Sequence, residues 1–126
     1  MLGWHELTSS SANVEDATLI ELDFSDATLS YVTGGARFAR ASLLGVEISE
    51  SDISGSQLQD SLEHGATMDD VDLSCGALRA SDLRASRLGE VNLTDAHLTR
   101  ADLTDASLFE VSLGESDHSG GSSWTP

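Results

Sequence analysis

The sequence lacks lysine, has a single cysteine and has no apolar run long enough to span a membrane. The single cysteine, Cys75, excludes an internal disulfide and is typical of a reducing compartment. Residues 1–11 lack the charged and apolar regions of a secretory signal. The sequence therefore predicts a soluble cytoplasmic protein that does not enter a membrane.

Motifs for catalysis and cofactor binding are also missing. The sequence has no glycine-rich phosphate loop and no nucleophile elbow. The histidines, His5, His64, His97 and His118, show no metal-ligand spacing. We therefore expect no cofactor and no bound metal, and the sequence favours a protein that is not an enzyme.

Charge of one sign dominates the composition. The chain has 22 acidic residues against 6 basic ones, which gives a formal net charge of -16 at pH 7. Such a charge repels DNA, RNA and anionic membranes and favours basic partners. Basic patches with interleaved aromatic residues, which are typical of nucleic-acid binding, are absent as well. We expect the chain to bind a basic protein surface and not to bind nucleic acid directly.

A five-residue repeat fills most of the chain. Large residues recur at every fifth position from Phe38 to Leu113, and fifteen of these sixteen repeat centres are apolar. A small residue, Ala, Val, Ser or Gly, lies two positions before each centre. A second run with the same period extends from Val14 to Leu29 and is out of step by one residue. Helices repeat near 3.6 and strands near 2, so this pattern predicts stacked units that share one core.

A longer period of twenty residues indicates how many sides the stack has. Val71 and Val91 are twenty residues apart, as are several acidic residues. The longest acidic series consists of Glu50, Asp70, Glu90 and Glu110. Twenty residues are four repeats, so a four-sided coil places each series in one column. The slip between the two runs falls at residues 32–35, where a glycine pair is typical of an irregular turn.

The repeat resembles that of the pentapeptide-repeat family, whose motif is Ala, then Asp or Asn, then Leu, then two variable residues. Matching triplets are Val71-Asp72-Leu73, Ser81-Asp82-Leu83, Val91-Asn92-Leu93 and Ala101-Asp102-Leu103. The resemblance covers residues 12–115 and implies an all-β fold, a right-handed quadrilateral parallel β-helix of about five coils. We expect residues 1–11 to form an N-terminal cap segment with Trp4 and Leu7, and residues 116–126 to form a flexible C-terminal tail.

The register predicts which side chains share a face of the coil. Four of the six arginines fall on one face, whereas most acids fall on two neighbouring faces, with Tyr31 near the N-terminal end of one of them. We expect a partner to contact these two acidic faces, with Phe109 as an aromatic anchor. The candidate partner-binding residues are Glu47, Glu50, Asp52, Asp69, Asp70, Asp72, Glu90, Asp95, Phe109 and Glu110.

Stacked acids on neighbouring faces approach the charge density of the DNA backbone. The family resemblance points the same way, because some pentapeptide-repeat proteins are DNA mimics that bind topoisomerases and protect DNA gyrase from poisons. The first hypothesis is a non-catalytic binding protein that offers acidic faces to a basic groove, such as that of a type II topoisomerase. The second is a structural or scaffolding module with another partner, on which the acids maintain solubility.

The resemblance leaves the oligomeric state open. Family members that dimerise do so through C-terminal helical elements, and residues 116–126 have no helical periodicity.

Glu63 is the one charged residue among the repeat centres. Strict register would bury it, and a buried unpaired carboxylate is very costly. We therefore favour a bulge that turns Leu62 inward and Glu63 outward, with Gly65 supplying the unusual backbone angle. The alternative is a Glu63–His64 proton-transfer pair in a local pocket, which gives the lowest-ranked hypothesis, an enzyme.

Overall fold

A computed structural model describes residues 8–9 and 11–121. These residues contain eight short strands and no helix. They therefore include no helix that could cross a membrane. The strands are β1 (Thr8–Ser9), β2 (Ala12–Asn13), β3 (Thr28–Ser30), β4 (Val32–Thr33), β5 (Glu47–Asp52), β6 (Thr67–Asp72), β7 (Arg87–Asn92) and β8 (Ser107–Phe109). The predicted cap residues Trp4 and Leu7 lie outside the described range.

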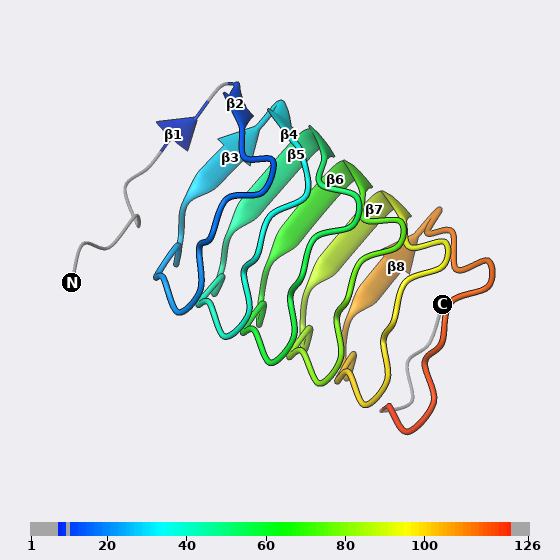
Figure 1. Ribbon diagram of the computed structural model, residues 1–126. Coiled ribbons are helices and arrows are strands. Elements are labelled where there is room, and N and C mark those ends of the chain that lie inside the picture. The colour runs from blue at the N-terminus through cyan, green and yellow to red at the C-terminus, as the bar shows by residue number, and fades with distance from the viewer. Residues whose placement is uncertain (1–7, 10, 122–126) are drawn as a thin grey trace.

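All strand pairs are parallel and join one lap of the chain to the next. The sheet order is β1-β3-β5-β6-β7-β8, with β2 beside β4 and β4 also beside β5. The strands follow one another along the axis of a solenoid (Figure 1). Thr67 of β6 is opposite Arg87 of β7, so a lap is twenty residues long. The four-sided all-β solenoid of about five laps is confirmed, and with it the predicted columns.

One lap is a residue shorter than the others. Thr28 is opposite Glu47, a separation of 19 residues. The missing residue falls at the predicted glycine pair. Gly34 has a φ of 100°, and a Cβ atom there would lie 2.6 Å from the backbone nitrogen of Glu15. A Cβ at Gly35 would lie 2.7 Å from a carbonyl oxygen of the next lap. The shortened lap therefore depends on glycine at both positions.

The five-residue period corresponds to one short bridge followed by one corner. At most corners the N–H three residues after the centre donates to the carbonyl of the centre, as Val46 does to Leu43 at 3.1 Å. The residue two positions after the centre has a positive φ, as at Arg40 (58°) and Asp60 (57°). A positive φ at the third position of such a turn is typical of a type II turn.

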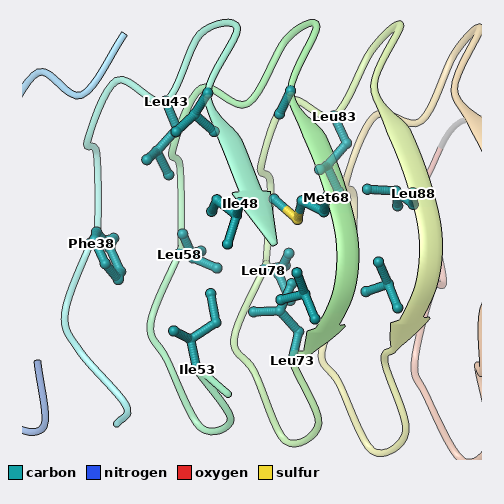
Figure 2. Packing of buried hydrophobic residues seen from close by; sticks show 14 of the residues in the cluster. Phe38, Leu43, Ile48, Ile53, Leu58, Met68, Leu73, Leu78, Leu83 and Leu88 are labelled. Carbon is teal, nitrogen blue, oxygen red and sulfur yellow. The ribbon is translucent and has the colours of Figure 1, made fainter. Parts of the chain in front are cut away.

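The repeat centres fill the interior (Figure 2). Leu43, Leu58 and Leu73 are each at most 2% exposed. The rings of Phe24 and Phe38 meet edge to face, with their centroids 5.9 Å apart. A void of about 10 Å³ remains between the apolar centres, roughly the room that one water molecule needs, and its apolar lining gives a water no partner.

The coil extends beyond both predicted boundaries. At the N-terminal end β1 pairs with β3, so the coil begins before residue 12. At the C-terminal end residues 116–121 continue the coil, where a loose tail was expected: Asp117 bridges His97 of the preceding lap, and the N–H of Ser119 donates to the Asp117 carboxylate at 3.0 Å. Asp117 thus takes the place of the Asp in the repeat motif, which explains why this polar segment still follows the coil.

Candidate functional site

One corner of the solenoid forms within strands. Strands β5, β6 and β7 run through it, and the fourth residue of each has a φ of 48°, 55° and 52°. These residues are Glu50, Asp70 and Glu90, and Glu110 follows in the next lap with a φ of 55°. We call the set of Glu50, Asp70, Glu90 and Glu110 the acidic ladder. The corner therefore carries a carboxylate at the same position in four successive laps.

The ladder residues are stacked neighbours. Ser51, Val71 and Val91, which follow the first three, pair in register across β5, β6 and β7. Strand spacing then places successive ladder residues about 4.8 Å apart. All four side chains are exposed. Like charges stacked in a sheet are unfavourable, and glutamate in the left-handed region is unfavourable too, so the ladder weakens the fold.

Asp52 and Asp72 form a second acidic column beside the ladder, where they are paired directly. Each carboxylate accepts a hydrogen bond from the backbone N–H two residues on, from Ser54 at 3.1 Å and from Ser74 at 2.8 Å. Asn92 occupies the next position of the column and does the same for Thr94. These two aspartates therefore shape the following turn, and a structural role accounts for them as well as a binding role does.

Tyr31 lies at the N-terminal end of the ladder corner, as predicted. Its backbone N–H donates to Ser49 at 3.2 Å, and its side chain is half exposed. A hydrogen bond to the Glu50 carboxylate and the negative charge of that group raise the pKa of Tyr31 above its ordinary value. Tyr31, Glu50 and the neighbouring acids Asp52, Asp70 and Asp72 line an open hollow of about 410 Å³.

The other predicted binding residues are distributed over two sides. Glu47 begins β5 and Asp69 lies in β6, both exposed on the side that precedes the ladder. Phe109 is on the same side and is 64% exposed, so its predicted outward orientation is confirmed. Asp95 lies at the corner after the next side, with a φ of 59°. Asp69 and Phe109 thus lie near the ladder, whereas Asp95 does not.

The described arginines that form ion pairs do so away from the ladder. Arg40 pairs with Glu21 of the preceding lap at 2.8 Å. Arg84 pairs with Asp82 at 2.7 Å, which lowers the pKa of Asp82, and lies 3.9 Å from Asp102. No ion pair within residues 8–9 and 11–121 involves a ladder residue. The ladder therefore presents its charge to solvent without a paired cation.

Comparison with known proteins identifies the repeat. Residues 77–115 match the family model for pentapeptide repeats, in eight copies. This part of the chain consists of pentapeptide repeats. None of the curated proteins matches the sequence.

Solved pentapeptide-repeat structures share the fold. A trypsin-treated variant of QnrB1, a plasmid-mediated fluoroquinolone resistance protein, matches with 17% identity and a TM-score of 0.52, over 86% of this chain and 61% of that one. HetL from the cyanobacterium Nostoc sp. strain PCC 7120, a pentapeptide-repeat protein involved in heterocyst differentiation regulation, matches with 20% identity and a TM-score of 0.50, over 87% of this chain and 56% of that one. At these identities the likeness shows the fold alone, and the chain spans less than two thirds of either protein.

In this pentapeptide-repeat chain the charged centre stays inside the coil. Glu63 is 0% exposed and Leu62 is 44% exposed, so the predicted bulge is wrong. The backbone pairing explains why, because the Glu63 N–H donates to the next lap at 2.8 Å and Leu62 accepts from the preceding lap at 2.7 Å. A bulge would break this backbone pairing with both neighbouring laps. Gly65 has a φ of 72°, as an ordinary corner residue does.

The Glu63 carboxyl is held as a neutral acid. Burial raises the pKa of Glu63 to about 8, and a hydrogen bond with Ser61 opposes part of the rise. The Ser61 hydroxyl contacts both the Leu58 carbonyl, at 2.5 Å, and Oε1 of Glu63. A hydroxyl has one proton to donate, and Ser81 in the next lap donates its own to the equivalent carbonyl at 2.8 Å. The Glu63 and Leu58 oxygens therefore compete for the Ser61 proton, which limits how far this hydrogen bond can stabilise an ionised Glu63.

The structure separates the two residues of the predicted proton-transfer pair. Glu63 points into the core, whereas His64 is exposed on the outer surface. Oε2 of Glu63 is enclosed and has no hydrogen-bond partner within the described residues. No group of three or more potential metal ligands is found in that part of the chain either. Glu63 is therefore out of reach of a substrate on the surface.

Proposed function

We propose that this pentapeptide-repeat chain is a non-catalytic binding protein whose acidic ladder enters a basic groove of a partner protein, and that the groove is the DNA-binding surface of a type II topoisomerase such as gyrase. The observation that carries the proposal is the ladder itself. Glu50, Asp70, Glu90 and Glu110 are exposed, stacked and without a paired cation in the described structure. They weaken the fold, so a role outside folding accounts for them better than a structural role does.

The spacing of the charges supports mimicry of a nucleic-acid backbone. Duplex DNA carries one charge per roughly 1.7 Å of axis, counted over both strands. The ladder alone carries one per lap, about 4.8 Å. Asp52 and Asp72 add a second column, and Asp69 adds a third charge beside them. A groove shaped for DNA would therefore meet a similar run of negative charge on a rigid rod.

The comparisons are consistent with this target. The QnrB1 structure shares the solenoid fold and is described as a fluoroquinolone resistance protein. Fluoroquinolones poison type II topoisomerases, so a rod of this fold that occupies the DNA groove would compete with DNA for the enzyme. The charge map of this chain, and not the shared fold, supports the proposal.

A gyrase supercoiling assay with and without a fluoroquinolone tests the proposal. The ladder variant changes Glu50, Glu90 and Glu110 to Gln and Asp70 to Asn. The control variant changes Asp16, Asp26, Asp60 and Asp105 to Asn, because these four are also exposed corner residues with φ of 59°, 61°, 57° and 60°. Both variants lose the same charge in the same backbone conformation.

We expect the wild-type protein and the control variant to inhibit supercoiling, or to protect it from the drug, in a dose-dependent way. The ladder variant should lose the effect. Equal effects of the two variants would mean that net charge, and not the ladder, is responsible. No effect of the wild-type protein would exclude the topoisomerase as target.

A scaffolding role is the second candidate. Leu44 and Leu62 are 39% and 44% exposed on the side that carries the Arg84 ion pairs, and the Leu62 carbonyl accepts from Leu43, so the two leucines lie on neighbouring laps. Exposed apolar side chains of this size suit a protein contact. A partner captured equally by the wild-type protein and the ladder variant, but lost when both leucines are changed to Ser, would favour this role.

A further inference from the structure

The side that precedes the ladder corner contains a slot. Gly89 of β7 is opposite Asp69 of β6 and Phe109 of β8, so a residue without a side chain lies between a carboxylate and an aromatic ring. Strands β6, β7 and β8 lie next to one another in this order (Figure 1). The hollow here is open and has a volume of about 300 Å³, and Arg87 forms another part of its lining. We call the space between Asp69 and Phe109, above Gly89, the slot.

The glycine is what keeps the slot open. A Cβ atom at Gly89 would lie 2.9 Å from Oδ1 of Asp69, so that carboxylate leans over the glycine. Gly89 lies inside a strand, where a glycine weakens the strand and often marks the close approach of another group. No unusual backbone angle requires it, because Gly89 is not among the positive-φ residues.

We propose that the slot receives an arginine side chain of a basic partner protein, held between the Phe109 ring and the Asp69 carboxylate. This inference rests on the proposed function, because it names the side chain through which such a partner is held. Asp69 and Phe109 are two strand spacings apart, on the order of 10 Å. That separation is between backbones, and the Asp69 carboxylate leans over Gly89 and shortens it. A guanidinium group stacks on a ring face at about 3.5–4 Å and binds a carboxylate at about 2.8 Å, so one such group fits between the two side chains.

The charge around the slot favours a cation. Asp69 lines it, and Asp70, Glu90 and Glu110 lie at the adjacent corner, one residue further along their strands or laps. Arg87 is the one base in the lining, so the four carboxylates in and beside the slot outnumber the cations there. Arginine suits the slot better than lysine, because its planar group can stack on the ring while its edge binds the carboxylate.

A hexa-arginine peptide titrated into the isotope-labelled protein tests the slot by NMR. We expect the Gly89 amide and the Phe109 ring signals to shift, and Gly89→Val to weaken binding by about three- to tenfold, the range expected for loss of a cation–π contact. Phe109→Leu should weaken binding to a similar extent. The matched control is Ser49→Val, which adds a similar side chain to the same column one lap before Asp69 and leaves the slot open.

The outcomes separate the slot from the topoisomerase target. Unshifted Phe109 signals, equal affinity of Gly89→Val and wild type, or equal affinity for hexalysine and hexa-arginine would overturn the slot. A peptide that shifts Phe109 in the wild type and not in Gly89→Val would support it, even if gyrase proved insensitive to the protein. In that case the proposed enzyme target fails and the arginine slot stands.

Discussion

Ser61 and Glu63 form a hydrogen-bonded pair of buried side chains in an interior whose other repeat centres, from Phe38 to Leu113, are apolar. The two residues are both fully enclosed. Ser61 is hydrogen-bonded to one carboxyl oxygen, while the second carboxyl oxygen has no partner in the described structure. The coil accommodates an acid in its core because that acid carries a proton.

The first prediction is that the protein loses stability as pH rises. The folded-state pKa of Glu63 is about 8, above the ordinary value of 4.5. Between these values the folded chain binds a proton that the unfolded chain has released. The contribution of Glu63 to stability is therefore complete below pH 4.5 and falls by roughly 1.4 kcal/mol per pH unit up to about pH 8. Urea unfolding followed by circular dichroism from pH 6 to pH 9 measures it.

Glu63→Gln is the control, because an amide has the shape of the neutral acid and does not titrate. The difference in unfolding free energy between the wild type and this variant isolates Glu63 from the many surface acids. We expect the variant to become the more stable of the two as pH rises. A difference that stays constant from pH 6 to pH 9 would show that Glu63 does not titrate in this range.

A second prediction concerns the partner hydroxyl. Ser61→Ala removes the hydrogen-bond partner of Glu63 and leaves a buried carboxyl unsatisfied, which costs about 1–3 kcal/mol at pH 6. Ser81 is the equivalent residue one lap further on, buried and bonded to a carbonyl, with Leu83 in place of the acid. Ser81→Ala should therefore cost less than Ser61→Ala. Equal losses in chemical denaturation would contradict the pairing.

The lap length could be predicted from sequence because the spacing of similar residues along the chain determines it. A period of five in size and of twenty in charge leaves one way to stack the repeats, and the pairing of Thr67 with Arg87 follows from it. The slip at Gly34 was equally visible, since two runs out of step require one short lap. The stacked ladder and the outward Phe109 follow from the same register.

Glu63 could not be placed in this way, because its position depends on a balance of energies. The sequence shows that a carboxyl at a centre is costly, but not that protonation and Ser61 lower the cost below that of breaking the backbone pairing. The turn-forming role of Asp52 could not be predicted from the residue spacing either, because it depends on a hydrogen bond that the carboxylate accepts from a backbone N–H. The slot could have been predicted from the sequence, because the twenty-residue period already places Gly89 between Asp69 and Phe109.

A third prediction uses the left-handed corners. Ala85 is exposed and has a φ of 57°, in a column where the preceding laps have Gly45 and Gly65. Because an L-residue in this conformation costs on the order of 1 kcal/mol, Ala85→Gly should stabilise the protein by about 0.5–1 kcal/mol. Ala77, which is not among the positive-φ residues, provides the control. Ala77→Gly should destabilise by a similar amount, and thermal unfolding should show shifts of opposite sign.

A fourth prediction treats Tyr31 as a probe of the ladder. It is the single tyrosine of the chain, so the ultraviolet absorbance of tyrosinate reports its ionisation alone. Its hydrogen bond to Glu50 and the charge of that carboxylate raise the pKa of Tyr31 above 10.0. Glu50→Gln should therefore lower the midpoint of the alkaline titration. Glu110→Gln, three laps away at the same corner, should leave the midpoint almost unchanged, because salt at 0.15 M largely screens charges that are more than about 8 Å apart. Equal shifts in both variants would mean that Tyr31 senses the net charge of the rod and not its contact with Glu50.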